Sequence, residues 1–285
     1  SDMSTVSSSM GAGLPLESGL GQGEGMLMNR FGMDGQVAIV TGASRGIGAA
    51  TSIGFAEAGA KLVLGARNEP DLNEVADRVR AAGSEAVVVA GSLHERRGLA
   101  QLVDAAVDTF GAVSTIVNNV GGSMPRAFLD TSEDDFDAAL RWNVTTAFNL
   151  TQLAVPHMLP AGGSVINITS IAGVHASRGF AAYGTAKAAM IQLTRVLAQD
   201  LAPKIRVNAI APGAIRTDAL DMVLDDDLHE RMLTATPLRR LGEPDDIAAA
   251  AVFLGSPASS YVTGEVIGIN GGIQTSNFDM GLPDL

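Results

Sequence analysis

Short runs of β-branched and other aliphatic residues recur along this chain, and longer segments with a helical period separate them. The runs are QVAIV, KLVLG, AVVVA, STIVN, SVINIT, IRVNAI and EVIGIN. The segments between them, such as 74–82 and 99–110, carry apolar residues three and four positions apart, which is the spacing of one helix face. Strands that are apolar on both faces and alternate with helices predict a parallel sheet covered on both sides. We therefore predict an α/β fold, a doubly wound sheet of seven parallel strands.

The first part of the chain has a different character from the rest. Residues 1–30 are rich in serine and glycine and show almost no aliphatic periodicity. Such a segment buries too little apolar surface to offset the entropy cost of ordering. We expect a flexible N-terminal tail over 1–30, or one that packs on a neighbouring subunit, followed by a single domain over 31–285.

Composition excludes several classes of function. The chain has no cysteine, so disulfides, thiolate metal sites and a cysteine nucleophile are excluded. Its four histidines lack the spacing of a metal site, and no metal is expected. A net charge of −12 argues against binding to nucleic acid or anionic lipid. With no apolar run of about 20 residues and no recognisable secretion signal, we expect a cytoplasmic protein without membrane or nucleic-acid partners.

A glycine-rich loop follows the first predicted strand, and a helix is predicted from about Ile47. Glycines let the backbone turn tightly and approach a diphosphate closely, and the amides and dipole of a helix N-terminus favour an anion. This context predicts a dinucleotide site in a Rossmann-type sheet. The residues expected to contact the cofactor here are Gly42, Ser44, Arg45, Gly46, Ile47 and Gly48.

The Gly-x-x-x-Gly-x-Gly spacing of this loop resembles the short-chain dehydrogenase/reductase family, and the later motifs follow in the family's order from Gln36 to Gly272. The resemblance implies an NAD(P)-dependent oxidoreductase that interconverts a carbonyl and an alcohol. Within 205–255 the chain resembles bacterial hydroxysteroid dehydrogenases and, nearly as much, 3-oxoacyl thioester reductases.

The end of the second predicted strand bears on the choice between NAD(H) and NADP(H). An acidic residue there would bind the ribose 2′-hydroxyl of NAD and repel the 2′-phosphate of NADP. This chain has Ala66 in that position, with Arg67 beside it and Arg45 on the glycine loop. Two guanidinium groups can bind one phosphate through charge-assisted hydrogen bonds. NADP(H) is therefore favoured over NAD(H).

The resemblance implies further cofactor contacts after three later strands. Where the family usually has an aspartate for the adenine amino group, this chain has Ser92, which can still accept a hydrogen bond. After the sixth strand, the Ile215 backbone is expected at the nicotinamide carboxamide and the Thr217 hydroxyl at the amide or diphosphate. The full set implied by these later motifs is Ser92, Leu93, Asn119, Val120, Gly121, Pro212, Gly213, Ile215 and Thr217.

Four residues are candidates for the chemistry, and the resemblance joins them into one catalytic set. Tyr183 and Lys187, four residues apart, share one helix face, and a nearby ammonium is expected to lower the pKa of the phenol towards that of a general acid/base. Ser170 ends the fifth strand and can donate to the substrate oxygen. Asn143 lies in a predicted helix, where asparagine is unfavourable. In the family the matching asparagine holds a water that links the lysine to solvent. Tyr183 and Lys187 are also expected to contact the cofactor.

The segment 218–238 corresponds to the part that covers the active site in the family, and its apolar residues Ala219, Leu220, Met222, Val223 and Leu224 favour a hydrophobic substrate. Candidates for the pocket wall are Gly122, Ser123, Met124, Ile171, Val174 and His175. The helices predicted over 134–159 and 181–201 are apolar beyond one face, so we expect a homodimer or homotetramer.

Three alternatives to this assignment stay open. The first is an NAD(H)-dependent hydroxysteroid-type dehydrogenase. The second is a nucleotide-sensing regulator without turnover, which would have no need for the four catalytic candidates together. The third is an S-adenosylmethionine methyltransferase, which usually needs an acidic ribose partner where Ala66 stands.

Overall fold

A computed structural model describes residues 27–217, 220, 225–275 and 282 of the chain. Its centre is a parallel sheet of seven strands in the order β3-β2-β1-β4-β5-β6-β7. This confirms the predicted fold class. The strands are β1 (Val37–Thr41), β2 (Lys61–Ala66), β3 (Ala86–Ala90), β4 (Thr115–Asn118), β5 (Gly163–Ile168), β6 (Ile205–Pro212) and β7 (Val266–Ile269).

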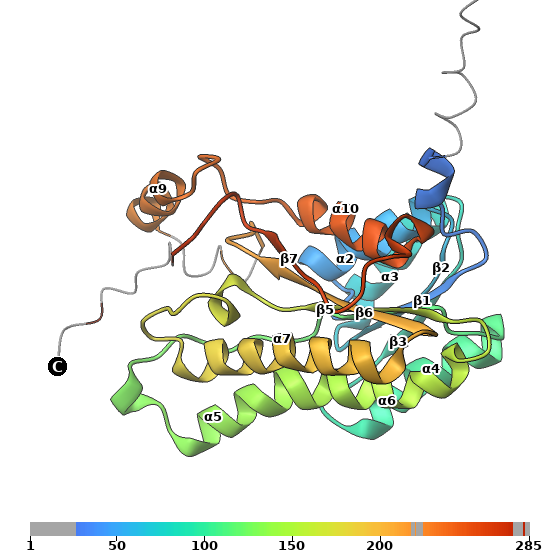
Figure 1. Cartoon of the computed structure of the whole chain (residues 1–285), viewed down its shortest axis with the longest axis horizontal. Coiled ribbons are helices and arrows are strands. Elements are labelled where there is room, and N and C mark those ends of the chain that lie inside the picture. Colours follow the sequence, from blue (N-terminus) through green and yellow to red (C-terminus); the bar gives the residue numbers. More distant parts are fainter. Residues whose placement is uncertain (1–26, 218–219, 221–224, 276–281, 283–285) are drawn as a thin grey trace, which may run out of the picture.

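Helices cover both faces of the sheet (Figure 1). One layer contains α2 (Gly46–Glu57), α3 (Glu69–Ala81) and α10 (Pro244–Gly255), and the other contains α4 (Arg96–Phe110), α5 (Glu133–Leu140), α6 (Thr146–Met158) and α7 (Ala181–Leu201). The remaining elements are η1 (Asn29–Phe31), η2 (Phe128–Asp130), η3 (Arg141–Thr145), η4 (Ile171–Gly173), α9 (Asp226–Ala235) and η5 (Pro257–Ser259).

The two-residue period of β1 divides the core between these layers. Ala38 and Val40 pack with α2, α3 and α10, whereas Val37 and Ile39 pack with α4 and α6. All four side chains are buried, with 2% exposure or less. Burial on both faces explains why the strand sequences are continuously apolar rather than alternating.

The predicted tail lies mostly outside the described residues. Its last residues lead into η1, where the Arg30 guanidinium donates to the Pro257 carbonyl at 3.1 Å and to the Ser260 hydroxyl at 3.0 Å. Met33 follows and is fully buried, and its Cε would lie 2.9 Å from a Cβ at Gly255. These contacts attach the start of the domain to the end of α10 and to η5.

The strand order determines where a ligand site can form on this sheet. From β1 the chain proceeds outward through β2 and β3, and then returns to the other side of β1 to form β4. Connections therefore diverge at the carboxyl ends of β1 and β4, which is where open α/β sheets form a ligand crevice.

Candidate active site

A cavity of about 1220 Å³ lies at this crevice. Pockets for a single small ligand usually span about 300–1,000 Å³, so the cavity has room for a dinucleotide and a second molecule. The predicted residues that line it are Gly42, Ser44, Arg45, Gly46, Ile47, Arg67, Leu93, Asn119, Val120, Gly121, Ser170, Tyr183, Lys187, Pro212, Gly213, Ile215 and Thr217. Gly48, Ser92 and Asn143 stand outside this lining.

The glycine loop owes its shape to backbone conformation and to an asparagine behind it. Gly42 and Gly46 have φ of 64° and 53°, in the left-handed region that favours glycine. Asn119 donates from its side chain to the carbonyls of Thr41, at 2.9 Å, and Gly42, at 3.2 Å. A Cβ at Gly48 would collide with the Gly42 carbonyl and lie 2.7 Å from the Asn119 amide nitrogen. Gly48 therefore lets α2 approach the loop.

The loop also offers a cradle of the kind a diphosphate requires. A Cβ at Gly42 would lie 2.8 Å from Asn119 Nδ2, and one at Gly213 would lie 2.8 Å from Asn270 Cα. Both glycines face the cavity, with α2 beginning directly beyond the loop. The bare backbone and the helix N-terminus fit a dinucleotide phosphate group.

The end of the cavity next to β2 carries both charge signs. Arg45 and Arg67 are exposed and line it, beside the buried Ala66. Asn68 and Asp71 line the same end, and sequence analysis missed both. Asn68 caps α3 by accepting from the Asp71 amide at 3.4 Å. The Asn-x-x-Asp spacing was a capping signal, which could have placed Asp71 on the first turn of α3, near the cavity.

The loop after β3 differs from expectation at Ser92. The Ser92 hydroxyl accepts from the His94 amide at 3.4 Å, and Ser92 stays outside the cavity lining. Trp142, which sequence analysis missed, lines the cavity and stacks on His94 with ring centroids 3.8 Å apart. Its position one residue before Asn143 was the signal that could have found it.

The catalytic candidates from β5 and α7 meet in the cavity. Ser170, directly after Thr169 at the end of β5, forms a side-chain hydrogen bond with Tyr183 and accepts from the Ala172 amide at 3.1 Å. The Lys187 ammonium donates to the Ile168 carbonyl at 2.9 Å and lies 5.6 Å from the centroid of the Tyr183 ring. A hydroxyl, a phenol and an ammonium therefore converge on one wall.

The expected lowering of the tyrosine pKa is not found. Burial raises the pKa of Tyr183, and the hydrogen bond from Ser170 opposes that rise only in part. Burial also lowers the pKa of Lys187 to about 7. The physical reason is that removing water disfavours both the phenolate and the ammonium, so near neutral pH the lysine carries only part of its charge.

Asn143 lies in η3, a π-helical turn that interrupts the helix formed by α5 and α6. Its side chain is fully buried. The amide oxygen accepts from the Gly122 N–H at 2.9 Å, and the amide nitrogen donates to the carbonyls of Gly122, at 3.1 Å, and Ala139, at 2.8 Å. A Cβ at Gly121 would collide with the Asn143 oxygen and lie 2.9 Å from Lys187 Nζ. Asn143 and Lys187 thus both pack where a side chain at Gly121 would lie.

Most of the residues predicted for the pocket wall that the structure describes line the cavity. Gly122, Ser123, Met124, Ile171 and Leu220 line the cavity, whereas Val174 and His175 do not. Ala219, Met222, Val223 and Leu224 lie outside the described residues. Sequence analysis missed Pro125, Ala172, Ser177, Phe180 and Met232. Phe180 packs on Tyr183 with ring centroids 5.9 Å apart, and its place three residues before Tyr183 was the available signal.

Two searches bear on other classes of site. Within 27–217 and 225–275, no group of three histidine, aspartate or glutamate side chains is placed to hold a metal ion. Among the helices that the structure describes, none combines the length and apolarity needed to cross a membrane.

The sequence over residues 42–274 matches a protein family described as enoyl-(acyl carrier protein) reductase. An uncharacterised oxidoreductase of Mycobacterium tuberculosis is 51% identical over 263 residues, covering 91% of this chain and all of the relative. The 7α-hydroxysteroid dehydrogenase of Escherichia coli is 43% identical over 242 residues, covering 84% of this chain and 94% of the relative.

Solved structures show the same likeness. A 7α-hydroxysteroid dehydrogenase complexed with NADH and 7-oxo glycochenodeoxycholic acid superposes with a TM-score of 0.84 at 42% identity, covering 87% of this chain and 98% of the other. A gluconate 5-dehydrogenase from Burkholderia cenocepacia, in complex with NADP and tartrate, has a TM-score of 0.81 at 33% identity, covering 86% and 98%. This chain belongs to the short-chain dehydrogenase/reductase family and is a pyridine-nucleotide-dependent oxidoreductase that acts on CH–OH and C=O groups.

Proposed function

We propose that this enzyme interconverts a carbonyl and a secondary alcohol on a hydrophobic substrate, with NADP(H) as the preferred cofactor. The observation that carries the proposal is the cavity itself. The glycine-rich loop that would hold the cofactor phosphates lines it, and so do Ser170, Tyr183 and Lys187. A regulator that only sensed a nucleotide would not need three such groups beside the cofactor.

Each residue has a role in the proposed reduction. A bound nicotinamide would supply the hydride that reaches the carbonyl carbon. Tyr183 gives its phenolic proton to the carbonyl oxygen, and Ser170 donates a hydrogen bond to the same oxygen as charge develops. Lys187, charged when it takes up a proton, stabilises the phenolate that remains. Oxidation of the alcohol uses the same groups in reverse.

Asn143 is assigned to the outer end of this proton relay. It packs against Gly121, as Lys187 does, and its side-chain bonds hold the Gly122 backbone. The resemblance to the family places a water beside the matching asparagine. A structural role at Gly122 and a relay role are compatible, because the Asn143 oxygen accepts one bond here and has capacity for a second.

Arg45 and Arg67 support the preference for NADP(H). Both line the end of the cavity where Ala66 replaces an acidic ribose partner, and a 2′-phosphate there would meet two guanidinium groups. Asp71 at the same end favours the second candidate, an NAD(H)-dependent hydroxysteroid-type enzyme, because its carboxylate would repel a phosphate. The NADH complex of a relative at 42% identity supports that candidate too.

The substrate end of the cavity is largely apolar. Met124, Ile171, Phe180, Leu220 and Met232 line it, which supports a hydrophobic ketone or alcohol. A screen of ketones and secondary alcohols, followed by absorbance of NADPH and NADH in parallel, tests the proposal. Turnover of hydrophobic ketones faster with NADPH is the expected result. Tight NADPH binding without turnover across the screen would support the regulator instead.

A homodimer or homotetramer is part of the proposal. Phe148 on α6 and Val196 on α7 are 41% and 45% exposed, although both helices also bury an inner face. Helices that are apolar on two sides commonly pack against a second subunit.

A further inference from the structure

The segment Gly122–Pro125 forms one wall of the substrate end of the cavity. Its start is fixed, because Gly122 has a φ of 137° that favours glycine and Asn143 binds both its N–H and its carbonyl. Met124 within the segment is 69% exposed, so neighbouring side chains do not hold it. The position of this wall therefore depends on what fixes the segment's other end.

Arg126 fixes that end through its backbone. Its N–H donates to the Gly179 carbonyl at 2.8 Å. Gly179 lies between Ser177 and Phe180, which line the cavity from another segment of the chain. One hydrogen bond at Arg126 thus joins two walls of the cavity at its mouth.

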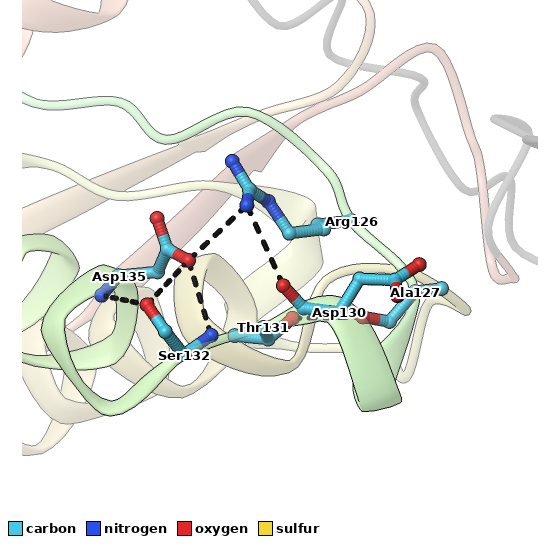
Figure 2. Close-up of polar contacts among 6 residues, drawn as sticks. All are labelled: Arg126, Ala127, Asp130, Thr131, Ser132 and Asp135. Carbon is cyan, nitrogen blue, oxygen red and sulfur yellow. Dashed lines mark hydrogen bonds and ion pairs between the residues drawn. The ribbon is translucent and has the colours of Figure 1, made fainter.

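The Arg126 side chain ties this junction to α5 (Figure 2). Its Nη1 approaches the Asp130 carbonyl oxygen at 3.4 Å and Asp135 Oδ2 at 3.3 Å. The same carboxylate oxygen accepts from the Ser132 amide at 3.1 Å and its hydroxyl at 2.7 Å, in the capping box that starts α5. The guanidinium therefore links the start of the segment 126–135 to the N-terminus of α5.

We propose that Arg126 is a positioning residue that sets the width of the substrate mouth, by holding Gly122–Pro125 against Gly179 from the N-terminus of α5. The inference rests on the proposed carbonyl–alcohol activity, and it adds a determinant of substrate size to it. The Arg126 and Asp135 side chains are 51% and 37% exposed, and exposed ion pairs add little to global stability. Loss of the Arg126 side chain keeps the backbone bond to Gly179 but removes its anchor on α5, so it loosens the wall without unfolding the domain.

Hydrogen exchange tests the clamp without any substrate. Arg126→Ala is expected to speed amide exchange in 121–135 and 177–180 and nowhere else, because a local contact governs local opening. Arg126→Lys should restore part of the protection. The matched control is Arg80→Ala, since Arg80 also forms an exposed ion pair, with Asp77 at 2.9 Å on α3. Unchanged exchange in both segments of Arg126→Ala would overturn the proposal.

Kinetics with NADPH and two ketones test the effect on specificity. For a 7-oxo bile salt, Arg126→Ala should raise KM about five-fold with kcat within about two-fold of wild type. Cyclohexanone, which is too small to depend on this wall, should keep its KM, and Arg126→Lys should lie between wild type and alanine. An equal KM increase for both ketones would contradict the proposal. If wild type reduces neither ketone nor any other carbonyl, the proposed function fails, and the exchange experiment still decides the clamp.

Discussion

The Lys187 ammonium donates a hydrogen bond of 2.9 Å to the Ile168 carbonyl, at the last residue of β5. This bond ties α7 to the end of the strand that is followed by Ser170, so it fixes the tyrosine and the serine relative to each other. Lys187 is only 3% exposed. A charged group placed there costs stability, which indicates that function rather than folding keeps it.

Tyr183→Phe is expected to lower turnover by about 10²–10⁴-fold, because it removes the proposed general acid. Cofactor binding should persist, and the fluorescence of Trp142, the chain's one tryptophan, can report it from the cavity wall. The chain's second tyrosine provides the control. Tyr261 is fully exposed, so Tyr261→Phe should keep full activity. Activity in Tyr183→Phe equal to that of the control would contradict the assignment.

Lys187→Met is expected to stabilise the fold at neutral pH while abolishing turnover. Burial lowers the pKa of Lys187 to about 7 from 10.5. Below the pKa of the folded state, Lys187 is protonated in both the folded and the unfolded protein, so the folded state carries the full cost of burying the charge. That cost fades as pH rises from about 7 to 10.5. The variant should gain on the order of 2 kcal/mol at about pH 6, after loss of one hydrogen bond.

Urea unfolding of wild type and Lys187→Met at several pH values measures this gain. It should shrink steadily up to about pH 10, where the unfolded lysine also loses its proton. Lys61→Met serves as control, since Lys61 is 41% exposed and pairs with Glu85 at 2.7 Å. A gain that is independent of pH would show that packing, and not the buried charge, explains it.

Arg206→Met is expected to destabilise the domain without changing the chemistry. The Arg206 guanidinium donates to the Ser259 hydroxyl at 2.8 Å and the Leu254 carbonyl at 2.9 Å, which joins β6 to the end of α10. Removing it breaks both bonds, at a cost of about 1–3 kcal/mol. Thermal unfolding should show a clear loss, with kcat retained in the folded protein. A melting temperature equal to wild type would contradict this role.

The strands and the phosphate loop could be predicted from the sequence, because both depend on local pattern. Seven apolar runs map onto seven strands, and the loop glycines take the backbone conformations that only glycine adopts easily. The direction of the tyrosine pKa could not be predicted in this way. It depends on how deeply the fold buries the phenol, and the effect of burial outweighs that of the hydrogen bond from Ser170. Residue spacing predicts which side chains lie close together, but it does not predict how far each one is removed from water.

Contacts between segments far apart in the sequence could not be predicted either. Trp142 stacks on His94 across 48 positions of the sequence, and Asn143 binds Gly122 from a π-helical turn. Neither the crossing of these segments nor the turn has a signature in residue periodicity. Asn143 was identified by its poor helix propensity, yet the partner that satisfies it could only come from the fold.

Phe148→Glu and Val196→Glu are expected to weaken self-association. Each places a charge on an exposed apolar position of α6 or α7, and burying that charge in an interface would be costly. Light scattering should give a dimer or tetramer for wild type and a smaller species for the double variant. The control is Val174→Glu, which is 51% exposed on the loop after η4. A monomeric wild type would contradict the proposed assembly.

We expect cofactor preference to depend on opposing charges at the end of the cavity next to β2. Arg67 and Asp71 both line it, so a 2′-phosphate would gain from the guanidinium and lose to the carboxylate. A charge-assisted hydrogen bond contributes about 1.5–3 kcal/mol, so one effective arginine predicts roughly ten-fold or greater preference for NADPH. Arg67→Ala should reduce that preference, and Ala66→Asp should reverse it by adding a ribose acceptor and a repulsive charge.

Asp71→Asn is expected to change the cofactor preference in the direction opposite to Arg67→Ala. Removing the carboxylate keeps the size of the side chain and removes the repulsion, so the ratio of kcat/KM for NADPH over NADH should rise above wild type. Asp77→Asn is the matched control, because Asp77 lies on the same helix and is 78% exposed. If wild type prefers NADH and Asp71→Asn shifts the ratio towards NADPH, then Asp71 is the ribose partner and the NAD(H)-dependent candidate is correct. A ratio unaffected by all three substitutions would place Arg67 and Asp71 away from the bound cofactor.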